Sequence, residues 1–197
     1  MAPGPFPTLG GVTSARLPTL VVVSGPAGTG KTMLARTLAA AIGCPVVSRD
    51  EIKEGMVHAS PGFVPAVGDE LTVRTLPVFF GVLELLVRAG VTTVAEAAFQ
   101  DTVWRPRLEP LRGLAEFRVV QCVVDADVAL ERIRGRRADD PLRRAHADSV
   151  ARFDLDHPQG HLAFDRVSIG ALQIEVDTAD GYRPGLDEIV AFVNRRG

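Results

Sequence analysis

The sequence predicts an α/β fold: a five-stranded parallel sheet with helices on both faces. Short apolar runs rich in β-branched residues alternate along the chain with stretches of helical periodicity. A glycine-rich segment joins the first of these runs to the first helix. Because a strand–helix–strand crossover returns the chain to the same edge of a sheet, this alternation favours parallel strands buried between helices.

The individual elements follow from these two periodicities. Apolar runs bounded by turn residues predict strands at 19–23, 45–48, 91–97, 117–124 and 172–176. Apolar residues three or four positions apart predict helices at 33–42, 50–57, 69–89, 104–114, 126–137 and 186–194. Residues 48–51 have the pattern of a capping box that opens the second helix. Pro77 is expected to kink the third helix or to divide it in two.

Length and composition indicate one soluble domain. The chain has 197 residues, of which 46% are hydrophobic, and it carries a net charge of −2. Residues 1–18 are rich in Pro, Gly and Thr and predict a flexible extension before a single domain at 19–197. No apolar run approaches the ~20 residues that span a bilayer, so no membrane partner is expected. Cys44 and Cys122 are far apart and are expected to be reduced thiols of a cytoplasmic protein.

The segment from Gly25 to Thr32 matches the phosphate-binding loop pattern G-x-x-x-x-G-K-[ST] at every fixed position. Backbone N–H groups of such a loop point at phosphate oxygens, and the helix that follows adds its positive end. Lys31 is expected to reach the β- and γ-phosphates, and the Thr32 hydroxyl to bind Mg²⁺. The expected nucleotide-binding residues are Gly25, Pro26, Ala27, Gly28, Thr29, Gly30, Lys31 and Thr32.

Two carboxylates follow later strands, at the sheet edge where ligands bind in such folds. Asp50 comes directly after the second strand, where a carboxylate can act as the general base for an acceptor hydroxyl. The alternative is that Asp50 only favours the start of its helix. Glu96 is the lone carboxylate in an apolar strand, and we expect it to act on the metal side, directly or through water. The alternative is a glutamate on an edge strand that faces solvent.

An arginine-rich stretch follows the fourth strand. Arg132 and Arg136 share one helix face and are expected to belong to a lid that stabilises charge on the transferred phosphoryl group. A solvated helix with paired surface charges is the alternative. Arg49, Gln100 and Arg105 are candidate acceptor-binding residues, since each lies just beyond a strand. His157 and His161 form a loop with Pro158 and Gly160 that suits a metal site poorly.

Together these residues resemble the small P-loop kinases related to polynucleotide kinases, chloramphenicol phosphotransferase and zeta-toxin-like enzymes. The likeness rests on 25–32, Ser48-Arg49-Asp50, Glu131-Arg132-x-x-x-Arg136 and Val176-Asp177-Thr178. It implies a nucleoside kinase-like P-loop NTPase fold with an Arg-rich lid, and transfer of the γ-phosphate of ATP to a hydroxyl. It also implies that Asp50 is the base and that Arg132 or Arg136 belongs to the lid. Many relatives carry Asp where this chain has Glu96.

The expected activity is therefore ATP- and Mg²⁺-dependent phosphorylation of a small molecule such as an antibiotic, a nucleoside or a sugar. The alternatives are a polynucleotide 5′-hydroxyl kinase and a P-loop ATPase or nucleotide-binding regulator without a small-molecule acceptor. The net charge of −2 makes a nucleic-acid partner the less favoured choice, because tracking phosphates requires a basic groove. The oligomeric state is left open.

Overall fold

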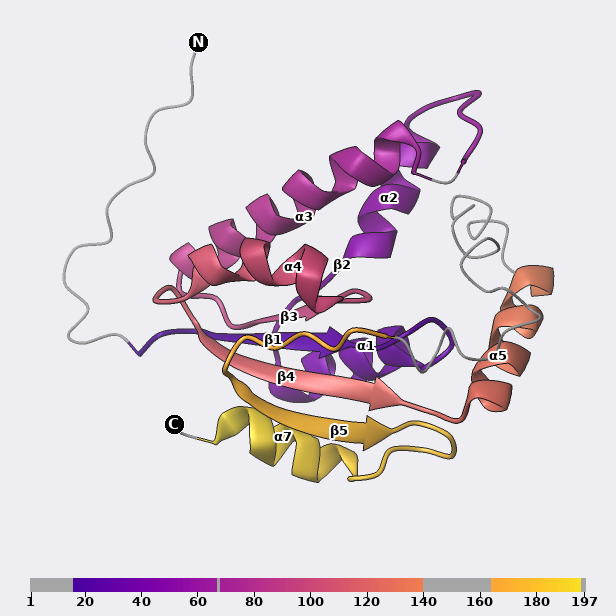
Figure 1. The fold of residues 1–197 in the computed structure, drawn as a ribbon. Coiled ribbons are helices and arrows are strands. Elements are labelled where there is room, and N and C mark those ends of the chain that lie inside the picture. Colours follow the sequence, from indigo (N-terminus) through magenta and orange to yellow (C-terminus); the bar gives the residue numbers. More distant parts are fainter. Residues whose placement is uncertain (1–15, 67, 140–163, 196–197) are drawn as a thin grey trace, which may run out of the picture.

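A computed structural model describes residues 16–66, 68–139 and 164–195. Most of the predicted N-terminal extension, the end of the arginine-rich stretch and the loop with His157 and His161 lie outside these residues. Figure 1 shows the fold, with the sheet between two layers of helices and α5 beyond the arrowheads of its strands.

All five predicted strands form one parallel sheet. Their order is β2-β3-β1-β4-β5, so the glycine-rich loop after β1 lies where successive connections leave to opposite sides. Such a switch point is where open α/β sheets bind ligands. The strands are β1 (Thr19–Ser24), β2 (Val46–Ser48), β3 (Thr93–Glu96), β4 (Glu116–Val123) and β5 (Leu172–Asp177).

Alternate residues of the strands build two separate cores, one on each face of the sheet. Leu20 and Val22 point to the face that α3 and α4 cover, whereas Val21 and Val23 point to the face that α1 and α7 cover. The helices are α1 (Lys31–Ile42), α2 (Arg49–His58), α3 (Glu70–Arg88), α4 (Asp101–Leu108), α5 (Ala126–Asp139) and α7 (Leu186–Asn194), with a 3-10 turn at Glu109–Leu111.

Both predicted ends of the fourth helix are wrong, and so is the prediction that Pro77 could divide the third helix. The fourth helix begins at Asp101 instead of Trp104, because the Asp101 carboxylate and backbone bond to 165–168 and fix the start of the helix there. It also ends at Leu108. Pro77 does not divide α3, since the helix continues past it to Arg88. Phe79 and Leu83, just beyond Pro77, are fully buried in the core, and this packing offsets the lost backbone hydrogen bond.

An ion pair that the sequence analysis did not anticipate joins α2 to the start of α3. The Lys53 ammonium lies 2.9 Å from a carboxylate oxygen of Asp69, and both side chains are buried. Asp69 also caps α3, because its other carboxylate oxygen accepts a hydrogen bond from the Thr72 amide at 2.7 Å. Burial opposes ionisation of Asp69, but the hydrogen bonds from Thr72 and Lys53 and the Lys53 charge outweigh it and lower the pKa to about 2.

The lowered pKa of Asp69 predicts a contribution to acid stability. A carboxylate with a depressed pKa stabilises the fold above its unfolded-state pKa, and this contribution is lost as the pH falls towards the folded-state value. The unfolding free energy of the wild type should therefore lose about 2 kcal/mol between about pH 4 and pH 2 through this group. Urea unfolding across that range should show this component in the wild type and not in Asp69→Asn. Equal pH slopes for the two proteins would contradict the assignment.

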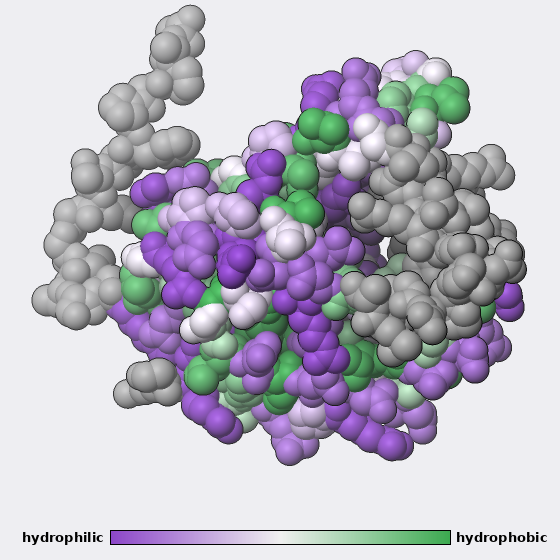
Figure 2. Space-filling view, in the orientation of Figure 1, coloured by the Kyte–Doolittle hydropathy of each residue, from purple (hydrophilic) through white to green (hydrophobic). Residues whose placement is uncertain are grey.

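The described surface carries no sign of a membrane-spanning element. In the view of Figure 2, hydrophilic residues dominate and the hydrophobic ones are scattered in small groups. No helix in the described ranges is both long and apolar enough to cross a bilayer.

Candidate active site

The predicted phosphate-binding loop connects β1 to α1. The Thr29 hydroxyl donates a hydrogen bond to the Pro26 carbonyl at 2.8 Å, and the Lys31 ammonium donates to the same carbonyl at 3.3 Å. Gly28 and Gly30 adopt φ values of 81° and 70°, which a residue with a side chain adopts only with strain. The helix α1 begins at Lys31, two residues before the predicted start, so the loop lies at its positive end.

The loop packs tightly against α5 at Gly28. A Cβ atom at this position would lie 2.5 Å from the Ala129 carbonyl oxygen and 2.9 Å from the Ala129 Cα. Ala129 is itself fully buried. The absence of a side chain at Gly28 therefore lets the helix that carries Arg132 approach the loop directly.

Gly28→Ala should destabilise the protein by about 2–5 kcal/mol, from left-handed backbone strain and overpacking against α5. It should also weaken nucleotide binding, because α5 must move away from the loop. Chemical denaturation and nucleotide titration measure the two effects. Gly43→Ala is the matched control: its φ of 77° imposes the same strain, but nothing lies within 4 Å of the added methyl group. Equal losses for the two variants would show that the contact with α5 is unimportant.

Arg132 connects three segments around the loop. Its guanidinium donates to the carbonyls of Thr178 at 2.6 Å and Ala179 at 2.9 Å, and weakly to that of Gly28 at 3.5 Å. The Thr178 hydroxyl in turn donates to the Thr29 carbonyl at 2.8 Å. The chain after β5 is thus bonded both to α5 and to the phosphate-binding loop. No role for Thr178 is predicted from the sequence, although Thr178 directly follows the last strand, at the end of the sheet where ligands bind.

Glu96 lies at the carboxyl end of β3 and is 1% exposed. β3 lies between β2 and β1, so the alternative of a solvent-facing glutamate on an edge strand is wrong. The Ser48 hydroxyl donates to its carboxylate at 2.7 Å. Ser48 makes no side-chain hydrogen bond to α2, so the predicted capping box is also wrong: the buried carboxylate takes the hydroxyl instead.

The pKa of the Glu96 carboxyl group depends on burial and on several neighbouring residues. Burial raises the pKa of its carboxyl group, and the negative charge of Asp50 raises it further. The Lys31 charge and hydrogen bonds from Ser48 and Thr32 act in the opposite direction. Glu96 is therefore within electrostatic reach of both Asp50 and Lys31, and it touches the hydroxyl of Thr32.

Asp50 lies in the first turn of α2, next to this carboxylate. The Arg49 guanidinium donates to it at 3.0 Å, and Arg49 is mostly buried. The next residue, Glu51, forms an exposed ion pair with Arg36 of α1. This ion pair joins the middle of α1 to the first turn of α2, the helix that carries Asp50.

The remaining candidate site residues lie in different parts of the structure. Arg49 contacts Asp50 directly. Gln100 is the N-cap of α4 and bridges to Arg166, while Arg105 is half exposed and lies 3.3 Å from Asp101 on its own helix. Arg136 is in α5, but its side chain lies outside the described part of the chain.

The residues present suit a magnesium ion bound with a nucleotide. Mg²⁺ prefers a few protein oxygens together with phosphate oxygens and water. Thr32 supplies a hydroxyl, and Glu96 supplies a carboxylate that is buried against the cation-binding end of the loop. No group of three or more His, Cys, Asp or Glu side chains arranged for a metal occurs among the residues that the structure describes.

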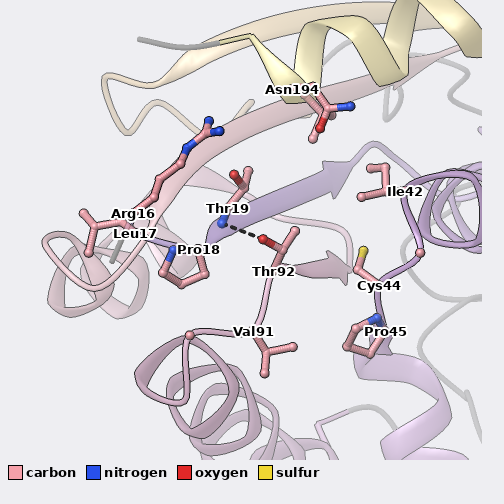
Figure 3. A pocket seen from close by; sticks show the side chains of 13 residues that line it. Arg16, Leu17, Pro18, Thr19, Ile42, Cys44, Pro45, Val91, Thr92 and Asn194 are labelled. Carbon is pink, nitrogen blue, oxygen red and sulfur yellow. Dashed lines mark hydrogen bonds between the residues drawn. The ribbon is translucent and has the colours of Figure 1, made fainter. Parts of the chain in front are cut away.

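A cavity of about 410 Å³ lies at the opposite edge of the sheet. Figure 3 shows it between the start of β1 and the ends of α1 and α7, with Ile42, Cys44, Thr92 and Asn194 around it. The Thr92 hydroxyl accepts a hydrogen bond from the Thr19 amide there. Since Thr19 begins β1 and the glycine-rich loop follows its other end, this cavity is not part of the phosphate site.

The fold and the loop define this protein as a member of the P-loop kinase-like proteins. Residues 20–155 match the family model AAA_33, described as an AAA domain, and the chain belongs to that family. A comparison with curated proteins finds no match.

Solved structures share the fold. A protein of Chloroflexus aurantiacus j-10-fl, proposed to be a kinase, has a TM-score of 0.78 at 23% identity, covering 90% of this chain and 97% of that one. A sugar kinase of Janibacter sp. HTCC2649 has a TM-score of 0.61 at 18% identity, covering 91% and 95%. A gluconokinase of Sinorhizobium meliloti 1021 has a TM-score of 0.51 at 22% identity, covering 90% of each chain.

Proposed function

We propose that this protein transfers the γ-phosphate of ATP to a hydroxyl group of a small molecule. The observation that carries the proposal is the pair of carboxylates beside the phosphate-binding loop. Asp50 and Glu96 both act electrostatically on this region, and Lys31 and Thr32 lie within reach of Glu96. One carboxylate at a metal and a second at an acceptor are what phosphoryl transfer to a hydroxyl requires.

Each residue has a role that its position supports. Backbone N–H groups of the loop and Lys31 hold the triphosphate, and Asp50 takes the proton of the acceptor hydroxyl as its oxygen attacks the γ-phosphorus. Thr32 and Glu96 hold Mg²⁺, Glu96 directly or through water; when bound, the ion neutralises charge on the β- and γ-phosphate oxygens. Arg49 orients the Asp50 carboxylate. Arg132 and Arg136 belong to a lid over the nucleotide, and Gln100 and Arg105 line the acceptor side.

The class of acceptor is a small molecule, such as a sugar, a nucleoside or an antibiotic. The sugar kinase and the gluconokinase, which share the fold, act on small hydroxylated compounds according to their names. The net charge of −2 favours the same class over a nucleic-acid end.

An acceptor screen with γ-labelled ATP tests this proposal. Sugars, nucleosides, aminoglycosides and amphenicols are offered separately, with a 5′-hydroxyl oligonucleotide as a further arm and Lys31→Ala as the blank. Label on a small molecule that Lys31→Ala does not produce is the expected result. Label on the oligonucleotide would make the protein a polynucleotide kinase. Release of free phosphate alone in every arm would make it an ATPase.

A further inference from the structure

The buried pair of Lys53 and Asp69 has no role in the reaction proposed above, but Lys53 lies close to Asp50 in the chain. Lys53 is on α2, three residues after Asp50, which places the two about one helical turn apart. Its side chain is 0% exposed and that of Asp69 is 6% exposed. A fully buried lysine is uncommon, because burying its charge without a partner is costly. The burial of Lys53 therefore depends on its contact with Asp69.

Stability alone is a poor explanation for such a pair. Removing two charges from water costs free energy that their attraction only partly returns, so apolar groups of similar size often stabilise a fold as well or better. An ion pair fixes the relative orientation of the two segments that carry it, since an ammonium and a carboxylate bond at a short distance and in few orientations. Asp69 is itself held by the Thr72 amide at 2.7 Å and the Ala66 amide at 3.3 Å. The carboxylate therefore forms a fixed point to which α2 is bonded.

The other contacts of α2 are less directional: Ile52 packs against the hydrophobic core on the α3 side of the sheet, and apolar packing has no preferred direction. The ion pair between Glu51 and Arg36 is exposed, and exposed pairs of this kind constrain a helix weakly. The Thr75 hydroxyl of α3 meets the Met56 sulfur at 3.7 Å, which is a weak hydrogen bond. β2 leads directly into α2, and its last residue, Ser48, is hydrogen-bonded to Glu96 of β3.

We propose that Lys53 and Asp69 are positioning residues for Asp50, because their buried ion pair sets the orientation of α2 on α3. This inference rests on the proposed function, in which Asp50 must align an acceptor with the γ-phosphate. An error of about 1 Å in such an alignment can cost about 10²-fold in rate. The pair thus acts on the acceptor side of the site and leaves the nucleotide side unchanged.

The double variant Lys53→Met/Asp69→Asn separates positioning from stability. Methionine keeps the length of the side chain without its charge, and asparagine is as good a helix N-cap as aspartate. The matched control is Glu84→Gln/Arg88→Met, which removes an exposed ion pair of α3. We expect the double variant to remain folded and to keep its affinity for MgATP within about twofold. Its kcat for an acceptor found in the screen should fall by about tenfold or more, with KM for ATP unchanged.

Hydrogen exchange gives a second readout that needs no acceptor. In the double variant, the amides of α2 should exchange about tenfold or more faster than in the wild type, while those of α1 keep their protection. Lys53→Met alone, which leaves Asp69 hydrogen-bonded to the Thr72 and Ala66 amides, should show the same pattern and serves if the double variant does not fold. Wild-type protection of α2 together with an unchanged kcat would overturn the inference. If the wild type phosphorylates nothing, the proposed function fails, and exchange in α2 alone decides whether the pair orients the helix.

Discussion

Asp50→Asn is expected to lower the rate of phosphoryl transfer by about 10²–10⁴-fold, the usual contribution of a general base. Asparagine has the shape of aspartate and can still accept the hydrogen bond from Arg49, but it cannot take a proton from the acceptor. The affinity for MgATP should stay close to that of the wild type. Single-turnover transfer from labelled ATP measures the rate, and calorimetric titration measures the affinity.

Glu51→Gln is the control for that experiment. It removes a carboxylate from the same helical turn, but one that pairs with Arg36 at the surface. Its effect on the rate should be less than about fivefold, the most that an exposed ion pair contributes. If Asp50→Asn and Glu51→Gln had similar rates, Asp50 would only stabilise the start of α2, as the alternative interpretation of the sequence holds.

Lys31→Ala is expected to reduce transfer by about 10²–10³-fold or more and to weaken the binding of ATP. Its ammonium group is the one expected to contact the β- and γ-phosphates, where negative charge increases during the reaction. Lys31 donates only to the Pro26 carbonyl among the hydrogen bonds of the described residues, but its charge favours the ionised form of the buried Glu96, so its loss should also lower the unfolding free energy. Binding of a fluorescent ATP analogue, transfer rate and urea midpoint are the measurements.

Arg36→Ala provides the matched control, because it removes the same charge from α1 at an exposed position. The control should bind ATP with nearly normal affinity. Normal transfer by Lys31→Ala would contradict a phosphate-binding role for the loop.

The order of elements and the position of the glycine-rich loop could be predicted because their signals are local. The glycine and lysine positions of 25–32 are consecutive in the chain, and each strand is a short apolar run. The rule that parallel strands present their carboxyl ends together then pointed to Asp50 and Glu96. The structure brings these two carboxylates within electrostatic reach of each other.

The features that escaped prediction depend on contacts between distant residues. Ser48 looked like a helix cap, but Glu96, which is 48 positions away, takes its hydroxyl. The start of α4 depends on bonds between Asp101 and residues 165–168. The partner of Lys53 is 16 residues along the chain, beyond the reach of helical spacing. In each case a polar group bonds to a residue that no local pattern identifies as its partner.

The path of the chain keeps α2, α3 and the ion pair between them on one stretch of sequence, 49–88. The glycine-rich loop, α5 and the chain after β5 bond to one another outside it. Recombination that exchanges 49–88 between members of the family would therefore move both helices together with the ion pair that joins them. The exchanged cassette would keep its internal ion pair, while the loop would keep its own hydrogen bonds.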